Sequence, residues 1–414
     1  MNIAMISYHT CPLATLGGKD TGGMNVYVRE LTRQLGRFGV HVDVFTRSQD
    51  EHVPHVLHDL GYGNRVIHIP AGPEIPLPKQ ELLTHIPAFT DRILNFTAEK
   101  GIQYDLIHSH YWMSGISALD LKKAWNVPIF HMFHTLGKMK NRIARSPQEM
   151  EGEYRIQGEE RVINGADRII AATLAEKAQL EFLYRTDVKK IDVIPPGVDT
   201  SHFYPISDDE AKAVIGIPKS DRLLLFVGRI EPLKGVDTLI RALALLRRNG
   251  LLEQYPHDLA IIGGDPNASL EEMNSEMLRL QMLCRELGIS DLVLFLGKRS
   301  QDLLPYYYSA AELLVMPSLY ESFGMVALEA MACGTPVVAS QVGGLAFLVQ
   351  DGITGYFVPD GDPEQLAERL SRLIQDPELR RRMGKQANVY AQAYDWSKIT
   401  SHIIQTYQRY LTPA

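Results

Sequence analysis

Cysteine is scarce in this sequence. Only three occur among 414 residues, at Cys11, Cys284 and Cys333, and none belongs to a CxxC pair. A scattered, odd-numbered set excludes a disulfide framework and provides no structural zinc motif. So few thiols fit a reducing compartment, and we expect a cytoplasmic protein.

Long apolar runs and an excess of positive charge are also missing. No stretch of about 18 apolar residues occurs, so we expect no integral membrane segment. The opening MNIAMISYHT lacks a basic segment before a long apolar stretch, which predicts a first strand rather than a secretory signal. The formal net charge of -7 argues against broad nucleic-acid binding. Any recognition of phosphate must therefore depend on a few basic residues at one site. A homo-oligomer is possible.

What the sequence does contain is a regular alternation of short apolar runs with amphipathic stretches. Continuous apolar runs separated by helical patterns are typical of parallel strands covered on both faces. The clearest helices are predicted at 24–38 and 235–249, and the tail is expected to be helical from about residue 364 to the end. The predicted strands lie at 2–7, 42–47, 66–72, 104–110, 127–135, 167–173, 190–196, 222–229, 258–265, 292–298, 312–318 and 336–340.

A Pro- and Gly-rich segment, PPGVDTSHFYP (195–205), interrupts this alternation and is the predicted linker. The fold class expected is therefore α/β, with two doubly wound domains in tandem facing an interdomain cleft. The predicted boundaries are 1–198 for the N-terminal domain and 199–390 for the C-terminal domain, with a C-terminal helix in 391–414 packing back on the N-terminal domain. Ligands of such sheets bind at the carboxyl ends of the strands.

A glycine-rich loop, GGKDTGGMN (17–25), follows the first strand and opens a helix. Glycines such as Gly22 and Gly23 let backbone N–H groups approach an anion, and a helix amino terminus adds positive potential. The loop matches neither GxGxxG nor a P-loop. It is either an anion-binding loop or a plain glycine-rich turn.

A second strand-to-helix loop, GRIEPLKG (228–235), carries Arg229 and Lys234. Cations at the start of a helix oppose its dipole, so two of them call for a reason. A diphosphate would supply that reason, and a solvated basic turn is the alternative.

A pair of carboxylates, Glu321 and Glu329, brackets the third segment, ESFGMVALE. Glu321 is predicted in a loop after a strand, and Glu329 two turns into the next helix. That helix is apolar and should be buried, where a carboxylate is costly without a partner. Ribose hydroxyls are one such partner, and a buried salt bridge is the other.

Histidines and basic residues gather in the N-terminal half. His108, His110 and His134 lie at predicted strand ends with no acidic residue nearby in sequence, so we expect a wall of the site rather than a metal centre. The basic residues form either a local phosphate pocket or an ordinary surface charge run. They are Lys79, Lys138, Lys140, Arg142, Arg145 and Arg155.

Taken together, these segments resemble the family 4 retaining glycosyltransferases of GT-B fold, which have two Rossmann-like domains. The resemblance covers nearly the whole chain and is carried by DTGGMNVY (20–27), HSHYW (108–112), HTLG (134–137), FVGRIEPLKG (226–235) and PSLYESFGMVALEAMACGTPVVAS (317–340). The last segment is the most specific.

Two branches of the family look similar to this chain. The spellings GGMN and HSHYW are closer to the inositol-phosphate N-acetylglucosaminyltransferases. Fructose 6-phosphate and UDP-glucose are more widespread metabolites, and on that ground we expect a sucrose-phosphate synthase. The alternative is transfer from UDP-N-acetylglucosamine to inositol phosphate. A sugar-nucleotide-binding protein without catalysis is the alternative of another class.

The resemblance also implies roles for individual residues. The UDP-sugar is a co-substrate whose diphosphate would be stabilised by cations, so we expect no essential metal and no tightly bound cofactor. Catalytic roles fall to His134, Arg229, Lys234 and Glu321. Donor-binding roles fall to Gly22, Gly23, Arg229, Lys234, Glu321, Phe323, Gly324 and Glu329. Acceptor-binding roles fall to Asn25, Lys79, Tyr111, Thr135 and Arg155.

Overall fold

A computed structural model describes residues 1–14, 21–144, 147–266 and 275–411. These residues form two compact units. The first contains 1–14, 21–195 and 396–411, and the second contains 196–266 and 275–395. The chain thus leaves the first unit inside the Pro- and Gly-rich segment 195–205 and returns to it at residue 396.

The first unit is built on one eight-stranded sheet, in the order β3-β4-β2-β1-β5-β6-β7-β8. All neighbouring strands are parallel except β3, a two-residue strand that pairs antiparallel with β4 and was not predicted. The strands are β1 (Asn2–Ile6), β2 (His41–Arg47), β3 (Val56–Leu57), β4 (Arg65–Ile69), β5 (Leu106–His110), β6 (Ile129–Met132), β7 (Arg168–Ala171) and β8 (Ile191–Val193).

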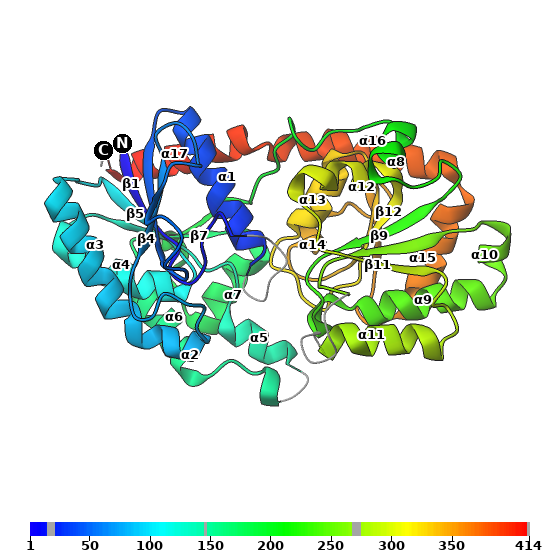
Figure 1. Ribbon diagram of the computed structural model, residues 1–414, viewed down its shortest axis with the longest axis horizontal. Coiled ribbons are helices and arrows are strands. Elements are labelled where there is room, and N and C mark those ends of the chain that lie inside the picture. Colours follow the sequence, from blue (N-terminus) through cyan, green and yellow to red (C-terminus); the bar gives the residue numbers. More distant parts are fainter. Residues whose placement is uncertain (15–20, 145–146, 267–274, 412–414) are drawn as a thin grey trace. The chain divides into compact units, whose positions relative to one another are not determined.

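Helices cover both faces of this sheet (Figure 1). α1 (Gly23–Arg37) and α17 (Trp396–Leu411) lie on one face. Residues at helical spacing along α17, from Trp396 to Tyr407, are buried and form the apolar stripe that holds it against the sheet. The opposite face carries α3 (Ile86–Lys100), α4 (Trp112–Trp125) and α6 (Glu153–Gly165), and the remaining helices of the unit are α2 (Lys79–Leu82), α5 (Gly137–Ile143) and α7 (Leu174–Tyr184).

The second unit has a six-stranded, fully parallel sheet in the order β11-β10-β9-β12-β13-β14. Its first strand shows why the sequence folds this way: all five residues of β9, LLLFV, are apolar and buried. The strands are β9 (Leu223–Val227), β10 (Asp258–Ile262), β11 (Val293–Gly297), β12 (Ala311–Met316), β13 (Val337–Ser340) and β14 (Gly355–Val358), of which only β14 was not predicted.

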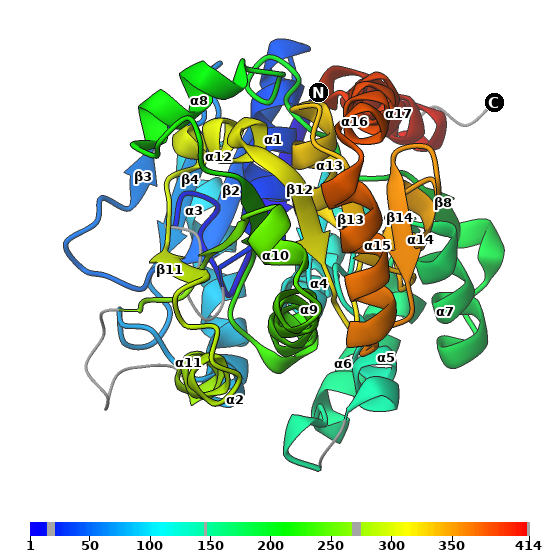
Figure 2. The ribbon, with the colours of Figure 1, turned by 90° about the vertical axis from the view of Figure 1, so that its right-hand side faces the viewer.

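Two layers of helices enclose this second sheet (Figure 2). α9 (Val236–Arg248), α11 (Ser275–Glu286) and α15 (Pro363–Gln375) pack into the core on one face. The other helices are α8 (Asp208–Ile215), α10 (Leu251–Gln254), α12 (Leu304–Ala310), α13 (Met325–Ala332), α14 (Leu345–Leu348) and α16 (Pro377–Ala391). The predicted continuous helical tail is interrupted, because Asp376 caps α16 by accepting a bond from the Leu379 N–H, and a further break precedes α17.

The strand orders place the ligand sites. In each sheet the order reverses beside the first strand, between β1 and β5 and between β9 and β12. Ligands of doubly wound sheets bind outside the carboxyl ends of the strands at this reversal. The predicted doubly wound α/β architecture is therefore confirmed for both units. No helix among the described residues is long and apolar enough to cross a membrane.

Candidate functional site

The loops that leave β9 and β12 are joined to each other in the second unit. The Leu319 N–H donates to the Leu233 carbonyl at 2.9 Å. Gly235 has φ +63°, and a Cβ there would lie 2.0 Å from the Pro317 carbonyl oxygen. Only glycine allows the two loops to approach this closely. The two segments predicted to bind the donor are thus brought together at the reversal point of the sheet.

We call the joined loops after β9 and β12 the donor cluster. Its two cations, Lys234 and Arg229, each have a carboxylate partner. Lys234 Nζ lies 2.5 Å from Glu321 Oε2, and these side chains are 18% and 14% exposed. Arg229 Nη1 lies 2.7 Å from Glu231 Oε1, at a more exposed position. Lys234 and Glu321, both predicted to bind the donor, are joined in one mostly buried ion pair, which holds the ammonium group in place beside the loop.

Glycines hold the loop that carries Glu321. Gly324 has φ +103° and precedes α13. Gly343 and Gly344, which follow β13, pack against this loop: a Cβ on Gly343 would meet the Glu321 carbonyl oxygen at 1.8 Å, and the Gly344 N–H donates to that oxygen at 2.9 Å. Sequence reasoning missed Gly343 and Gly344. A Gly-Gly pair after a predicted strand was the signal that could have found them.

Glu329 lies closer to the start of its helix than predicted. It is the fifth residue of α13, not two turns into it, and it is 6% exposed. The Tyr308 hydroxyl donates to Glu329 Oε2 at 2.8 Å. Burial raises the pKa of Tyr308, so this hydroxyl stays protonated and remains a donor. A protein partner thus offsets part of the cost of burying the carboxylate, and the role of Glu329 in binding ribose stays a prediction.

In the first unit, Asn25 shapes the start of α1. Residues 17–20 of the glycine-rich loop lie outside the described residues. The Gly22 N–H donates to Asn25 Oδ1 at 2.9 Å, while Asn25 Nδ2 donates to Thr10 Oγ1 at 2.7 Å and to the Cys11 carbonyl at 2.8 Å. Both amide protons of Asn25 are therefore used within the protein. The Gly22 amide, predicted to face the diphosphate, is bonded to Asn25.

Four of the five predicted acceptor residues lie together, and we call them the acceptor cluster. They are Tyr111, Lys79, Thr135 and Arg155. Tyr111 follows β5, has φ +70° and precedes α4. Lys79 Nζ lies 5.9 Å and Arg155 Cζ 5.2 Å from the centre of its ring. Arg155 Nη2 also donates to both the carbonyl and the hydroxyl oxygen of Thr135, each at 3.0 Å. Positive φ at a non-glycine residue costs free energy and is common at functional sites.

Arg155 is buried and forms ion pairs with two glutamates. Its side chain is 2% exposed and lies 2.8 Å from Glu159 and 2.6 Å from Glu151. Two other basic residues of this region have carboxylate partners as well, since Lys140 pairs with Glu151 and Lys138 with Glu160. Arg145 lies outside the described residues. Of the two cations predicted to bind the acceptor, Lys79 is exposed, at the start of α2, and Arg155 is buried.

The histidines form a cluster in which His108, His110 and His131 are buried and His134 is partly exposed. His110 Nδ1 lies 3.0 Å from His134 Nε2. The Tyr407 hydroxyl lies 2.6 Å from His108 Nδ1. The Ser109 hydroxyl lies 2.8 Å from His131 Nδ1. His134 has φ +61°. Burial lowers the pKa of both His108 and His134 to about 3, so these rings are neutral at physiological pH. Within the described ranges, no group of three or more His, Cys, Asp or Glu residues is arranged to hold a metal ion.

These neutral histidines predict acid destabilisation. Their folded pKa values lie below the unfolded value near 6.5, so the unfolded chain binds more protons between about pH 3 and pH 6.5. The free energy of unfolding is highest above this range and decreases as the pH is lowered. At pH 5 the loss is on the order of 2 kcal/mol per histidine. Thermal unfolding measured from pH 7.5 to pH 5 should show a falling Tm, with a smaller fall in His108→Gln. A Tm independent of pH would contradict the assignment.

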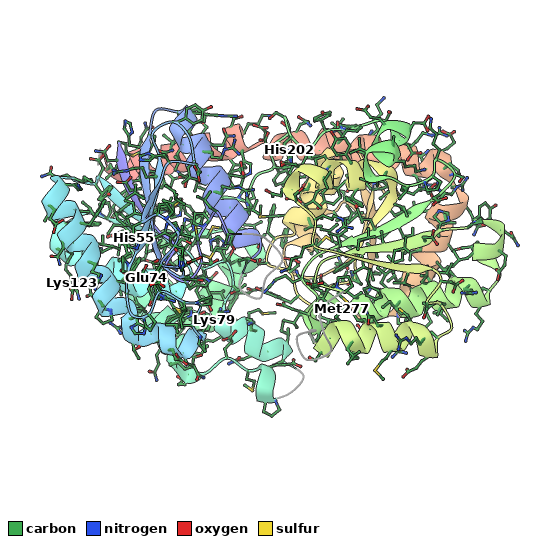
Figure 3. The ribbon with its side chains drawn as sticks, viewed as in Figure 1. His55, Glu74, Lys79, Lys123, His202 and Met277 are labelled. Atoms are coloured by element: carbon green, nitrogen blue, oxygen red, sulfur yellow. The ribbon has the colours of Figure 1, made fainter. Side chains whose placement is uncertain are left out.

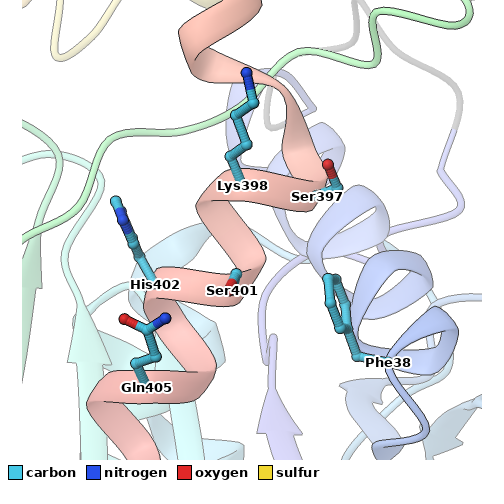
Figure 4. Close-up of a pocket in the computed structure, with 6 residues that line it drawn as sticks. All are labelled: Phe38, Ser397, Lys398, Ser401, His402 and Gln405. Carbon is cyan, nitrogen blue, oxygen red and sulfur yellow. The ribbon is translucent and has the colours of Figure 1, made fainter.

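A hollow elsewhere on the first unit contains none of the predicted site residues (Figure 4). It is lined by Phe38, just after the carboxyl end of α1, and by side chains of α17. The Gly22–Asn25 arrangement lies at the other end of α1. The hollow is therefore not part of either cluster described above.

Comparisons with known proteins identify the family of the chain. Residues 21–202 match the family model "Glycosyltransferase Family 4", and residues 207–389 match "Glycosyl transferases group 1". D-inositol 3-phosphate glycosyltransferases resemble the chain over nearly its whole length. The one from Frankia alni is 41% identical over 98% of this chain and 99% of its own, and the one from Saccharomonospora viridis is 42% identical over 98% and 93%.

Solved structures show the same fold. The sucrose-phosphate synthase of Thermosynechococcus elongatus superposes with a TM-score of 0.89 at 36% identity, covering all of both chains. Anabaena HepE in complex with UDP-glucose superposes with a TM-score of 0.73 at 20% identity, covering 99% of each chain. With two parallel α/β units, a loop cluster at each strand-order reversal and these relatives, the chain belongs to the family 4 glycosyltransferases of GT-B fold.

Proposed function

We propose that this glycosyltransferase moves a sugar from a UDP-sugar to an inositol phosphate, with retention of the anomeric configuration. The observation that carries the acceptor is the 41–42% identity to D-inositol 3-phosphate glycosyltransferases over nearly the whole chain. The expectation of fructose 6-phosphate rested on how widespread that metabolite is, not on a motif. UDP-N-acetylglucosamine, the donor of the branch with the closer motifs, is the first donor to test.

Sucrose-phosphate synthesis is the second candidate. It is supported by the TM-score of 0.89 and the 36% identity to a sucrose-phosphate synthase. Both candidates require a phosphorylated small acceptor and a nucleoside diphosphate sugar. They therefore assign the same chemistry to the two clusters and differ in the groups that surround the acceptor.

The donor cluster supplies positive charge to the leaving diphosphate. Breaking the anomeric bond leaves negative charge on the diphosphate, and preorganised cations stabilise such charge most when water is excluded. Lys234 is held in place by Glu321, so its ammonium group needs no reorganisation during the reaction. Arg229 is more exposed and can turn from Glu231 towards the diphosphate. In this proposal the two cations do the work that a divalent metal does in other transferases.

The acceptor cluster divides two tasks between its cations. Lys79 is exposed and lies over Tyr111, so it is the group proposed to contact the acceptor phosphate directly. Arg155 is buried, neutralised by two glutamates and bonded to Thr135. Its proposed task is to fix Thr135 and Tyr111 in the geometry that the acceptor needs. His134, which follows β6, is proposed to lie beside the transferred sugar.

A crossed assay tests this function. UDP-glucose and UDP-N-acetylglucosamine are each combined with fructose 6-phosphate and with inositol 3-phosphate, and release of UDP is followed. We expect rapid release only with UDP-N-acetylglucosamine and inositol 3-phosphate. Release only with UDP-glucose and fructose 6-phosphate would establish the second candidate instead. No acceptor-dependent release in any pairing would leave a sugar-nucleotide-binding protein without transferase activity on these acceptors.

A further inference from the structure

The segment that carries Lys79 has no regular structure of its own. Between the end of β4 at Ile69 and the start of α2 at Lys79, no residue belongs to a strand or helix. Four prolines, at positions 70, 73, 76 and 78, remove backbone N–H donors from this stretch. Its carbonyl oxygens still need donors wherever they are buried. Something outside the segment must therefore fix its path.

Arg47 donates hydrogen bonds to three of these carbonyl oxygens. This arginine ends β2 and is fully buried. Its guanidinium group donates to the carbonyl oxygens of Ala71 at 3.3 Å, Pro73 at 2.6 Å and Ile75 at 2.5 Å. A planar group with several fixed donors can hold three carbonyls in one geometry, which a lysine ammonium on a flexible stem cannot reproduce.

Tyr8 holds the other end of the same segment. It follows β1, its side chain is fully buried, and its hydroxyl donates to the Leu82 carbonyl at 2.6 Å. The Tyr8 carbonyl in turn accepts a bond from the Arg47 N–H at 3.0 Å. The two side chains thus come from the ends of neighbouring strands and form one connected unit, which we call the 8/47 clamp.

Lys79 lies between the two attachment points of the 8/47 clamp. It is four residues after Ile75 and three residues before Leu82. A further contact secures the stretch before it, because Glu74 Oε2 lies 3.0 Å from His55 Nε2 (Figure 3). With both ends fixed, the Lys79 ammonium group is held 5.9 Å from the Tyr111 ring centre.

We infer that Arg47 and Tyr8 are positioning residues that set the affinity for the phosphorylated acceptor by fixing Lys79 over Tyr111. Neither residue needs to touch the acceptor. The inference rests on the proposed function, in which Lys79 contacts the acceptor phosphate. It assigns a task to a buried arginine that donates to three backbone carbonyls of the segment before Lys79.

Steady-state kinetics of Arg47→Lys and Tyr8→Phe test the inference, with Tyr104→Phe as the matched control. Tyr104 is also buried in the first unit, and its hydroxyl donates to Asp43 at 2.7 Å, away from the segment. We expect both clamp variants to raise the acceptor KM about tenfold, with little change in kcat or in the donor KM. The control should leave all three unchanged.

The same substitutions in a Lys79→Ala background distinguish positioning from general damage. If Arg47 and Tyr8 act through Lys79, they should add no further rise in acceptor KM there, because the group they position is gone. Hydrogen exchange of backbone amides 71–83, measured without substrates, should be faster in both clamp variants than in Tyr104→Phe. Either additive effects on acceptor KM or unchanged exchange would overturn the inference.

The outcome also separates this inference from the proposed function. A wild-type protein that transfers sugar to no phosphorylated acceptor would refute the function, and the clamp's role in acceptor affinity with it. Wild-type transfer with clamp variants that behave as Tyr104→Phe does would refute the clamp alone.

Discussion

Lys234→Ala is expected to lower kcat by about 10²–10³-fold while leaving the fold intact. Loss of one preorganised group that stabilises developing charge typically has an effect of this size. The substitution also removes the ion-pair partner of Glu321, 2.5 Å away, so a carboxylate would then face the diphosphate without compensation. Steady-state release of UDP with saturating acceptor measures the effect, and circular dichroism verifies the fold.

Lys219→Ala is the matched control in the same unit. Lys219 pairs with Asp209 at 2.6 Å, but its side chain is 70% exposed, and exposed pairs contribute little. Its turnover should equal that of the wild type. Near-normal turnover of Lys234→Ala would remove Lys234 from the chemistry and leave the ion pair with Glu321 a structural one.

Arg155→Ala should have the largest effect on stability and a strong, selective effect on the acceptor. The substitution leaves Glu159 and Glu151 without their buried cation, and breaking such a pair typically costs about 3–5 kcal/mol in the free energy of unfolding. Thr135 and Tyr111 also lose the group that orders them. Denaturant unfolding should show the loss of stability, and the acceptor KM should rise far more than the donor KM.

A second variant separates the two effects of Arg155. Arg155→Met combined with Glu159→Gln removes the charge of Arg155 and of its more buried partner, while Glu151 keeps its pairing with Lys140, so much of the stability should return. The acceptor KM should remain high, because the contacts to Thr135 are still missing. Equal changes in donor and acceptor KM in this double variant would contradict a role for Arg155 on the acceptor side.

The positions of the loops could be predicted from sequence because they follow from topology. Once the continuous apolar runs are taken as parallel strands, Arg229 and Glu321 must follow strands and lie at the same edge of a sheet. The strand order β9-β12 then makes them neighbours. The same reasoning placed Tyr111 at a strand end in the first unit.

The partners of these residues could not be predicted, because they come from distant parts of the chain. Glu321 pairs with a lysine 87 residues away, and Glu329 receives a hydrogen bond from Tyr308 on a different helix. The sequence alone does not distinguish a carboxylate that binds ribose from one that accepts a hydrogen bond from a tyrosine of the same protein. Strand β3, with two residues, is too short to show any periodicity, and β14 was missed although other strands of four residues were predicted.

Asn25 shows a different limit of motif reasoning. The resemblance assigned it to the acceptor, and its place beside the glycine-rich loop supported that role. Its side chain is 1% exposed and bonded to Gly22, Thr10 and Cys11. These bonds give it a task in shaping the loop, so its effect on the acceptor can be indirect. Its contact with the acceptor stays a prediction.

The most direct test of the central claim is the identity and anomeric configuration of the product. The enzyme is incubated with UDP-N-acetylglucosamine and inositol 3-phosphate, and the product is isolated and analysed by proton NMR. Because the sugar in the donor is α-linked, retention predicts an α-linked N-acetylglucosaminyl inositol phosphate, recognised by a small coupling between the protons on C1 and C2. A β-linked product, or unchanged inositol 3-phosphate, would contradict the account.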